Sequence, residues 1–315
     1  MSEPRATDEL LRILGVLREQ LPLRDATAIF FPPALGYELL RGFVEDAERS
    51  GGDFDPEMPD PSLFEPALEL ARWLSRNYFS VTVRDASRVP ATGPVMLVGN
   101  HSAGLMPVDA LFAINAIRDA YGPKRAIHPL VHDFAYRAPR IGKHARRMGL
   151  LRATRENAAA ALAAGRIVMA YPGGDQEAFR PYNERNRVVL AGRKGFVELA
   201  LKERVPIVPL VSVGLHESFF VLTRGERLAR KLDLKSVLRA EVAPLALMLP
   251  WGLAPAFVPF LPLPTEIEMR FGEPILLGGD PEDRGAVDEG YRRVESTMQK
   301  MMDELAAGRV PLAGR

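Results

Sequence analysis

A histidine and an aspartate that follow an apolar run are the residues best suited to chemistry in this chain. The segment VGNHSAGLMPVDA places His101 at the end of an expected strand, and Asp109 in the first turn of a helix expected from about Pro107. Imidazole is a base near neutral pH, and a carboxylate on its other nitrogen fixes the tautomer and stabilises the imidazolium. The pair can therefore take the proton of a hydroxyl that attacks an acyl group. The alternative is that His101 only caps the turn and Asp109 only serves the helix N-terminus.

A second candidate site is the turn that follows the run RIVMAYP. Gly173 and Gly174 have no Cβ, so backbone N–H groups there can approach a phosphate or an oxyanion closely. Glu177 is expected either to bind an acceptor hydroxyl or to pair with a nearby cation. Three cations close in sequence can bind phosphate groups, Arg180, Arg193 and Lys194. The alternative is an ordinary strand-to-loop turn with solvated charges.

Two further patterns carry less weight. His128 and His132 have the four-residue spacing of zinc-binding histidines, and Asp133 follows them. A proline stands in place of the usual glutamate after the first histidine, so a strand end that lines a pocket is the preferred interpretation. Ser102 follows His101, but the chain contains no G-x-S-x-G elbow, and adjacent strand residues point apart. A serine hydrolase is therefore disfavoured.

The elements that must position these residues alternate between strands and helices from about residue 79 onward. This alternation predicts an α/β fold with a mixed, largely parallel central sheet flanked by helices. The runs VMLV, IVMA and IVPLV are apolar on both faces and are expected to be central strands. The run TEIEMRF alternates apolar and charged residues, so it is expected to be a half-exposed edge strand. A helix over about 287–305 is expected to close the fold.

The first 60 residues are expected to form a helical segment of their own. Apolar residues fall at helical spacing over about 10–21 and again over about 35–44. The segment SGGDFDPEMPDP then concentrates Gly, Pro and Asp, as in an exposed connector. The chain is therefore divided into an N-terminal helical segment, 1–60, and a main domain, 61–315.

Composition excludes several classes of function. The chain has 41 Lys and Arg against 40 Asp and Glu, a net charge of +1, so it lacks the basic excess of a nucleic-acid binder. It contains no cysteine, which excludes disulfides, thiol nucleophiles and thiolate zinc sites. The N-terminus carries acidic residues and lacks the basic start and apolar core of a signal peptide. A cytoplasmic protein is expected.

Several segments in order resemble the sequence blocks of the glycerolipid and lysophospholipid acyltransferases. GNHSAGLMPVDA resembles their first block, VMAYPGGDQEAFRP their third and VPIVPLVSVG their fourth, with the helical GRKGFVELALKE between the last two. Here seven residues separate His101 from Asp109, where most of that family has four. The third block reads Pro172-Gly173-Gly174 with the glutamate at Glu177, a form similar to the diacylglycerol acyltransferase branch, although the His-Pro-His-Gly signature of that branch is absent.

The resemblance implies an O-acyltransferase in which His101 is the general base and Asp109 orients its ring. The acyl donor would be acyl-CoA or acyl-ACP, and the acceptor a hydroxyl of a glycerolipid or lysophospholipid. No cofactor or metal is implied. Phe134 and Arg137, or Arg140, are the nearest matches to the second block and would belong to the substrate site. Two alternatives stay open: a lipid-binding or lipid-transfer module with weak or no catalysis, and a lipid esterase that uses His101 to activate water.

A lipid acceptor requires access to a membrane surface, and one segment is suited to it. Residues 242–265 form an uncharged apolar run long enough to span a bilayer, but its six prolines exclude a straight spanning helix. The run therefore either fills the core or lies at the membrane interface, where Trp251, Phe257 and Phe260 are the expected contacts. The expected location is cytoplasmic, peripherally associated with the inner face of the membrane, with acyl carrier protein as a further possible partner.

Overall fold

The computed structural model describes Arg12 and residues 59–102, 104, 108–131, 145–234, 241–256 and 260–312 of the chain. The expected N-terminal helical segment, 1–60, lies almost entirely outside these residues, and so do Phe134, Arg137, Arg140 and Phe257. The described fold begins with helix α3 (Pro61–Asn77). Asp60 caps this helix, because its side chain accepts a hydrogen bond from the backbone N–H of Ser62.

Three fully buried strands form the centre of a seven-stranded sheet, in the order β1-β10-β6-β2-β5-β3-β4. They are β2 (Val95–Gly99), β5 (Ile167–Ala170) and β6 (Ile207–Val213), and every residue in them is buried. Strand β2 lies between the other two and pairs parallel with both. The runs that are apolar on both faces were predicted to be central strands, and this prediction is confirmed. Helices cover both faces of this part of the sheet.

Four strands extend the sheet on its two sides. Strand β3 (Ile127–Val131) pairs parallel with β5, and β4 (Leu151–Arg152) pairs parallel with β3. On the other side β10 (Glu266–Phe271) runs antiparallel to β6, and β1 (Ser80–Arg84) is parallel to β10. The sheet is therefore mixed and largely parallel, as expected.

The expectation that TEIEMRF forms an edge strand is wrong. Strand β10 is the second strand from its side of the sheet, and β1 forms the edge beyond it. Glu268 of β10 is buried, and one of its carboxylate oxygens lies 2.8 Å from the guanidinium of Arg84 on β1. An alternating pattern therefore does not require an exposed face, because a neighbouring strand can supply a partner for a covered charge.

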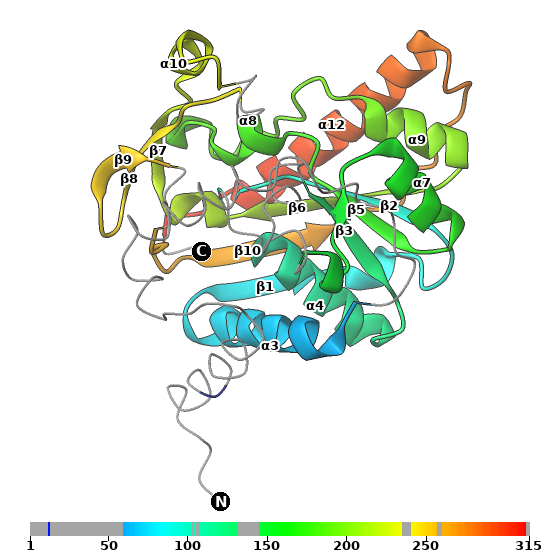
Figure 1. Ribbon diagram of the computed structural model, residues 1–315, viewed down its shortest axis with the longest axis horizontal. Helices are drawn as coiled ribbons and strands as arrows, with labels where there is room; N and C mark the ends of the chain where they lie inside the picture. The colour runs from blue at the N-terminus through cyan, green and yellow to red at the C-terminus, as the bar shows by residue number, and fades with distance from the viewer. Residues whose placement is uncertain are drawn as a thin grey trace, which may run out of the picture.

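Helices cover both faces of the sheet, which gives three layers (Figure 1). Helices α3 and α4 (Val108–Tyr121) pack on one face, in a core with Phe79, Leu97 and Met169. Helices α7 (Arg155–Ala163), α9 (Gly195–Glu203) and α12 (Arg284–Ala306) pack on the other face. Helix α12 contains the expected closing helix over 287–305.

A second, three-stranded antiparallel sheet lies at one side of the molecule. It consists of β7 (Phe220–Thr223), β8 (Leu245–Met248) and β9 (Gly252–Pro255), and α10 (Glu226–Lys231) lies between β7 and β8 in the chain. The apolar run over 242–265 therefore forms a hairpin in its described part. No helix within the described ranges has both the length and the apolar composition needed to cross a membrane.

Candidate active site

His101 and Asp109 meet at the carboxyl end of the central strand β2. The imidazole Nδ1 of His101 lies 2.7 Å from the Oδ2 of Asp109, which is in the first turn of α4. The other carboxylate oxygen, Oδ1, accepts a hydrogen bond from the backbone N–H of Ala110 at 2.8 Å. The side chain of Asp109 is 1% exposed and that of His101 is 20% exposed. The aspartate is therefore held inside the protein, while the imidazole stays accessible.

Asn100 ties the end of β2 to the neighbouring strand β6. Its Oδ1 accepts a hydrogen bond from the backbone N–H of Ser212 at 2.7 Å, and its Nδ2 donates to the carbonyl of Ser212 at 3.0 Å. The same Nδ2 donates to the hydroxyl of Ser102 at 3.0 Å. The side chain of Asn100 thus continues the sheet hydrogen bonding beyond the last strand residue and holds the chain on both sides of His101.

Glu177 binds the backbone of His101. It lies in the short helix α8 (Gly174–Ala178) and is buried. Its Oε2 accepts a hydrogen bond from the backbone N–H of His101 at 2.9 Å, and its Oε1 accepts one from the N–H of Val189 at 3.0 Å. Burial raises the pKa of Glu177 to about 6, against the opposing effect of the Arg180 charge and these two hydrogen bonds.

Arg180 binds the same backbone unit from its other side. Its Nη1 donates to the carbonyl of His101 at 2.9 Å, and its Nη2 donates to the hydroxyl of Ser102 at 3.0 Å and to the carbonyl of Arg185 at 2.8 Å. The side chain is fully buried, and burial lowers the pKa of Arg180 to about 10 although the Glu177 charge opposes this. Glu177 and Arg180 together therefore bind both the N–H and the carbonyl of His101.

His216 and Tyr171 are two residues of the site that the sequence did not single out. His216 follows β6 in the 3-10 turn Leu215–Glu217, and its Nε2 donates to the carbonyl of Arg180 at 2.7 Å. Burial and then the Arg180 charge lower the pKa of His216 well below its usual value, so this imidazole is neutral. The available signal was its position, since a polar residue directly after a buried parallel strand lies at the same edge as His101.

The ring of Tyr171 packs beside the His101–Asp109 pair. Its centroid lies 5.1 Å from that of the His101 ring. The ring occupies the space in which a side chain at Gly99 would lie, because a Cβ there would be 2.6 Å from the Cε1 of Tyr171. Burial, and then the charges of Asp109 and Glu177, raise the pKa of Tyr171 well above its usual value. Gly99 is therefore explained by the close approach of this ring to the end of β2.

The Gly-Gly turn is closely packed. A Cβ at Gly173 would lie 2.0 Å from the backbone oxygen of Val189 and 2.5 Å from the Cβ of Glu177. Gly174 has φ +51°, and a Cβ there would lie 2.2 Å from the Nη1 of Arg193. The first glycine thus allows the segment at Val189 to approach α8, which brings the N–H of Val189 to the carboxylate of Glu177. The second adopts a left-handed conformation that favours glycine.

The two exposed cations of the expected site have acidic partners. The guanidinium of Arg193 lies 3.0 Å from a carboxylate oxygen of Asp175, and its Nη1 donates to the carbonyl of Pro172 at 3.1 Å. The ammonium of Lys194 lies 2.6 Å from the carboxylate of Asp288. Lys194 also lines a cleft of about 840 Å³ whose walls carry both basic and acidic side chains. The structure thus places Arg193 beside the Gly-Gly turn and Lys194 between α9 and α12.

The remaining candidates have contacts of other kinds. His128 is buried, with Nδ1 2.8 Å from the carbonyl of Gly149 and Nε2 3.0 Å from the Nη1 of Arg166, while His132 and Asp133 lie outside the described residues. The hydroxyl of Ser102 is held by Asn100 and Arg180, as described above. Trp251 and Phe260 are partly buried against the core of the small sheet, and the Phe260 ring lies 4.7 Å from that of Phe219.

The electrostatics of the pair suit a general base. Burial lowers the pKa of His101, but the charge and hydrogen bond of Asp109, with a smaller contribution from Glu177, raise it above the usual 6.5 overall. With Nδ1 donating to Asp109, Nε2 carries the lone pair that can accept a proton. The arrangement can therefore abstract a proton from a hydroxyl and later return it to a leaving group.

The family model for diacylglycerol acyltransferases matches residues 66–286 of this chain. A Mycobacterium tuberculosis protein of uncharacterized function is 32% identical over 260 residues, which cover 81% of this chain and 69% of that protein. The human DGAT1/2-independent enzyme synthesizing storage lipids is 27% identical over 150 residues, 48% of this chain and 44% of that protein. Diacylglycerol O-acyltransferase 1 of Eremothecium gossypii is 31% identical over 193 residues, 56% of this chain and 41% of that protein.

The fold is similar to that of a solved acyltransferase. The crystal structure of the 1-acyl-sn-glycerophosphate (LPA) acyltransferase PlsC from Thermotoga maritima matches with a TM-score of 0.51. The match covers 96% of this chain and 97% of that one at 15% sequence identity. This likeness concerns the fold: a mostly parallel sheet between two layers of helices.

Proposed function

The chain belongs to the diacylglycerol acyltransferase family, and from this premise we propose that it moves a fatty acyl group from a thioester donor to a hydroxyl of a glycerolipid. The observation that carries the proposal is the 2.7 Å contact of His101 and Asp109 at the carboxyl edge of the central sheet. The contact supports the proposal because the two side chains meet although seven residues separate them in the chain. A module that only bound lipid would not need a histidine held in this way.

In the proposed reaction His101 acts first as a base and then as an acid. Its Nε2 takes the proton of the acceptor hydroxyl while the hydroxyl oxygen attacks the carbonyl carbon of the thioester. Backbone N–H groups at the same edge stabilise the oxyanion of the tetrahedral intermediate. When that intermediate collapses, the carbon–sulfur bond breaks and the imidazolium returns its proton to the thiolate. Asp109 holds the ring and stabilises the imidazolium throughout.

Three details of the proposal concern the substrates and the location. The donor is acyl-CoA or acyl-ACP, since both present a thioester on a phosphopantetheine arm. The acceptor is a neutral glycerolipid such as diacylglycerol, which is supported by the family match and by the Gly173-Gly174 form of the third block. The protein acts at the membrane surface, where such an acceptor is dissolved. Phe134 and Arg137 remain candidates for the substrate site.

The test is an assay of thiol release from acyl-CoA by the purified protein, with and without diacylglycerol in vesicles. Transfer predicts thiol release that depends on the acceptor, together with triacylglycerol detected by mass spectrometry. His101→Ala should reduce the rate by about 10²–10⁴-fold, the usual contribution of a catalytic base. Equal thiol release without acceptor, with free fatty acid as product, would identify an esterase. Lipid binding without thiol release from either donor would identify a lipid-binding module.

A further inference from the structure

Seven leucines with large exposed fractions gather on the small sheet and on α10. Ten large apolar side chains are strongly exposed among the described residues, and seven of them lie between residues 222 and 261. Each of these seven is between 48% and 59% exposed. We call them together the leucine surface: Leu222, Leu228, Leu232, Leu247, Leu249, Leu253 and Leu261. Single exposed apolar residues are common on proteins, but a group of this size marks a binding surface.

The strand register places four of these leucines on one face of the hairpin. Leu247 of β8 lies opposite Leu253 of β9 in the ladder. Leu249 lies opposite Leu261 in an isolated bridge, in which the N–H of Leu261 donates to the carbonyl of Leu249 at 2.9 Å. Ala246 and Met248, which alternate with them along the strand, are buried on the other face. The sheet thus has one face in the core and one apolar face exposed.

The buried side of the small sheet is connected to the catalytic loop. Its core includes Phe179, which directly precedes Arg180, and Phe219, two residues after the turn that contains His216. Gly104, in the loop between His101 and Asp109, lies against both rings: a Cβ there would be 3.3 Å from Phe219 and 3.5 Å from Phe179. A membrane bound on the exposed face of this sheet would therefore be separated from the loop that carries the catalytic pair by the sheet and its core.

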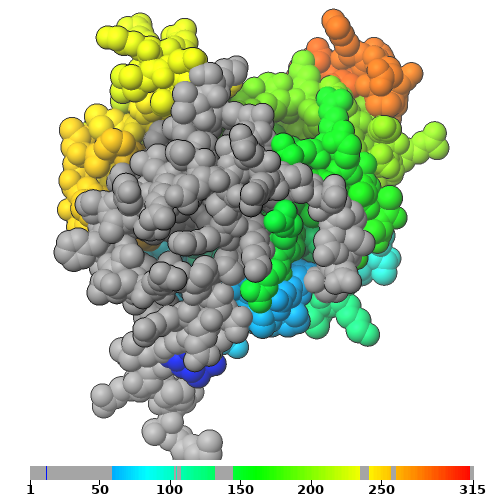
Figure 2. Space-filling model, viewed as in Figure 1, coloured from blue at the N-terminus to red at the C-terminus, as the bar shows by residue number. Residues whose placement is uncertain are grey.

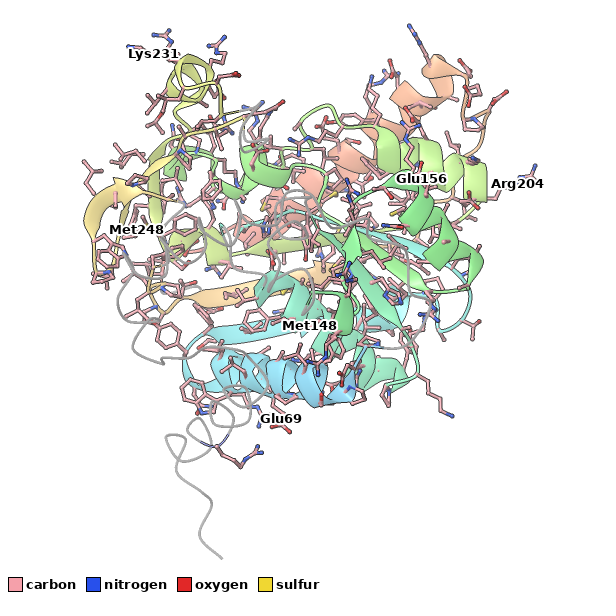
Figure 3. All side chains as sticks on the ribbon, in the orientation of Figure 1. Glu69, Met148, Glu156, Arg204, Lys231 and Met248 are labelled. Carbon is pink, nitrogen blue, oxygen red and sulfur yellow. The ribbon has the colours of Figure 1, made fainter. Side chains whose placement is uncertain are left out.

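Basic side chains accompany the leucines. Helix α10 carries three basic residues against one acidic residue, and two of them lie in its last turn. Arg227, Arg230 and Lys231 are exposed, and none forms an ion pair with another described residue. Lys231 extends outward at the far end of α10 (Figure 3). In Figure 2, α10 and the small sheet form one flank of the molecule, opposite the flank formed by α7, α9 and α12.

We propose that the leucine surface, with the basic residues of α10, is where this protein docks on a bilayer that contains anionic lipid. Protein interfaces are enriched in aromatic residues and arginine at their centre, whereas this surface is entirely aliphatic with cations beside it. That combination suits the acyl boundary of a bilayer, with the cations at the level of the headgroups. The proposal rests on the proposed function in one respect, that the acceptor is dissolved in the membrane.

Trp251 and Phe260 were expected from the sequence to contact the membrane, but their packing gives them a different role. Both pack against the core of the small sheet and support the hairpin from inside. The exposed contacts are the leucines, which strand alternation places outward. The hairpin therefore inserts aliphatic side chains, and its aromatic residues hold it in shape.

The experiment is vesicle flotation of the purified full chain, compared between phosphatidylcholine alone and phosphatidylcholine mixed with phosphatidylglycerol. The wild type should bind the mixed vesicles more tightly, and added salt should weaken that preference. A variant with Leu247→Ser, Leu249→Ser and Leu253→Ser should bind at least about tenfold more weakly, because each leucine withdrawn from the acyl boundary loses its transfer free energy. The control, Leu276→Ser with Val310→Ser, removes two apolar residues elsewhere that are at least as exposed and should bind like the wild type.

Additional variants distinguish between the outcomes of this experiment. Arg227→Gln with Arg230→Gln and Lys231→Gln should abolish the preference for anionic vesicles. If the triple leucine variant fails to fold by circular dichroism, the single changes Leu253→Ser and Leu261→Ser serve instead. Equal binding of the leucine variant and its control would overturn the proposal. A second result would also overturn it: a wild-type protein that does not bind vesicles and is a dimer in light scattering, while the leucine variant is a monomer. That result would assign the surface to a second copy of the chain.

Docking is measured without turnover, so it is tested apart from the enzymatic proposal. His101→Ala should float with vesicles like the wild type. The leucine variant should retain transfer from a short-chain acyl-CoA to a water-soluble monoacylglycerol, and should lose activity only on acceptor embedded in vesicles. Loss of activity on both acceptors would contradict a role limited to docking.

Discussion

The Nδ1 of His101 and the Oδ2 of Asp109 are 2.7 Å apart, although seven residues lie between them in the chain. The strand end carries the histidine, and the first turn of α4 carries the aspartate, so the intervening loop only has to bridge two fixed elements. Loop length therefore matters little to this contact, because the sheet and the helix that packs on it set the positions of both residues.

Asp109→Asn should lower kcat by about 10²-fold, because an amide neither stabilises the imidazolium nor enforces the tautomer with a free Nε2. The KM values should change little. Asp119→Asn, in the exposed last part of the same helix, is the matched control and should leave kcat unchanged. Wild-type kcat in Asp109→Asn would contradict the assignment of this carboxylate.

The pH dependence of kcat/KM should report the His101 base. The base is active when neutral, and Asp109 favours its charged form, so kcat/KM should rise with pH through an apparent pKa above 6.5. In Asp109→Asn the carboxylate charge is gone, so the midpoint should move to lower pH. A midpoint that moved to higher pH would show that Asp109 does not act on the titrating group.

Arg180→Lys should destabilise the site although it keeps the charge. A single lysine ammonium cannot replace the guanidinium at the carbonyl of His101, the hydroxyl of Ser102 and the carbonyl of Arg185 together, so at least one of these buried acceptors loses a donor. The free energy of unfolding should fall by about 1–3 kcal/mol and kcat should fall with it. Arg155→Lys, at an exposed ion pair, should change stability by less than about 0.5 kcal/mol. Denaturant unfolding and steady-state kinetics measure both; equal stability of the two variants would remove Arg180 from the positioning machinery.

The two glycines of the turn should respond differently to alanine. Gly173→Ala places a Cβ against the backbone oxygen of Val189. Moving that segment away would strain the hydrogen bond that the N–H of Val189 donates to Glu177, so a loss of about 1–3 kcal/mol and a lower kcat are expected. Gly174→Ala meets the flexible end of Arg193 and costs about 1–2 kcal/mol through its left-handed backbone, with less effect on kcat. Gly278→Ala, with open space around it, is the control. A greater loss of kcat in Gly174→Ala would reverse this assignment.

Arg193→Ala and Lys194→Ala test the expected phosphate contacts. At least one should raise the KM for acyl-CoA, and the wild-type KM should rise with ionic strength, because both side chains are partly exposed and their charges are screened by salt. Lys124→Ala, on an exposed turn, should leave the KM unchanged. Unchanged KM values in both variants would limit these cations to the ion pairs with Asp175 and Asp288.

The sequence alone was sufficient for the class of fold, the three central strands and the candidate pair His101 and Asp109. Strands buried on both faces are recognised by continuous apolar runs, and a base after such a strand is recognised by its position and its chemistry. The position of β10 was predicted wrongly. The alternation of apolar and charged residues in TEIEMRF does not show which neighbouring element covers the charged side chains.

Only the tertiary structure showed what surrounds His101 and which residues of the apolar run are exposed. The partners of His101 come from separate segments, Asp109 on α4 and Glu177 and Arg180 in and after α8, and His216 after β6 binds the carbonyl of Arg180 in turn. Their contacts depend on strand order, which local patterns do not contain. In the same way, the register of β8 and β9 decides that Leu247 and Leu253 face outward, while Trp251 packs inward. Residue types therefore determined what chemistry was possible, and the pairing of distant strands determined which residues lie together at the candidate site.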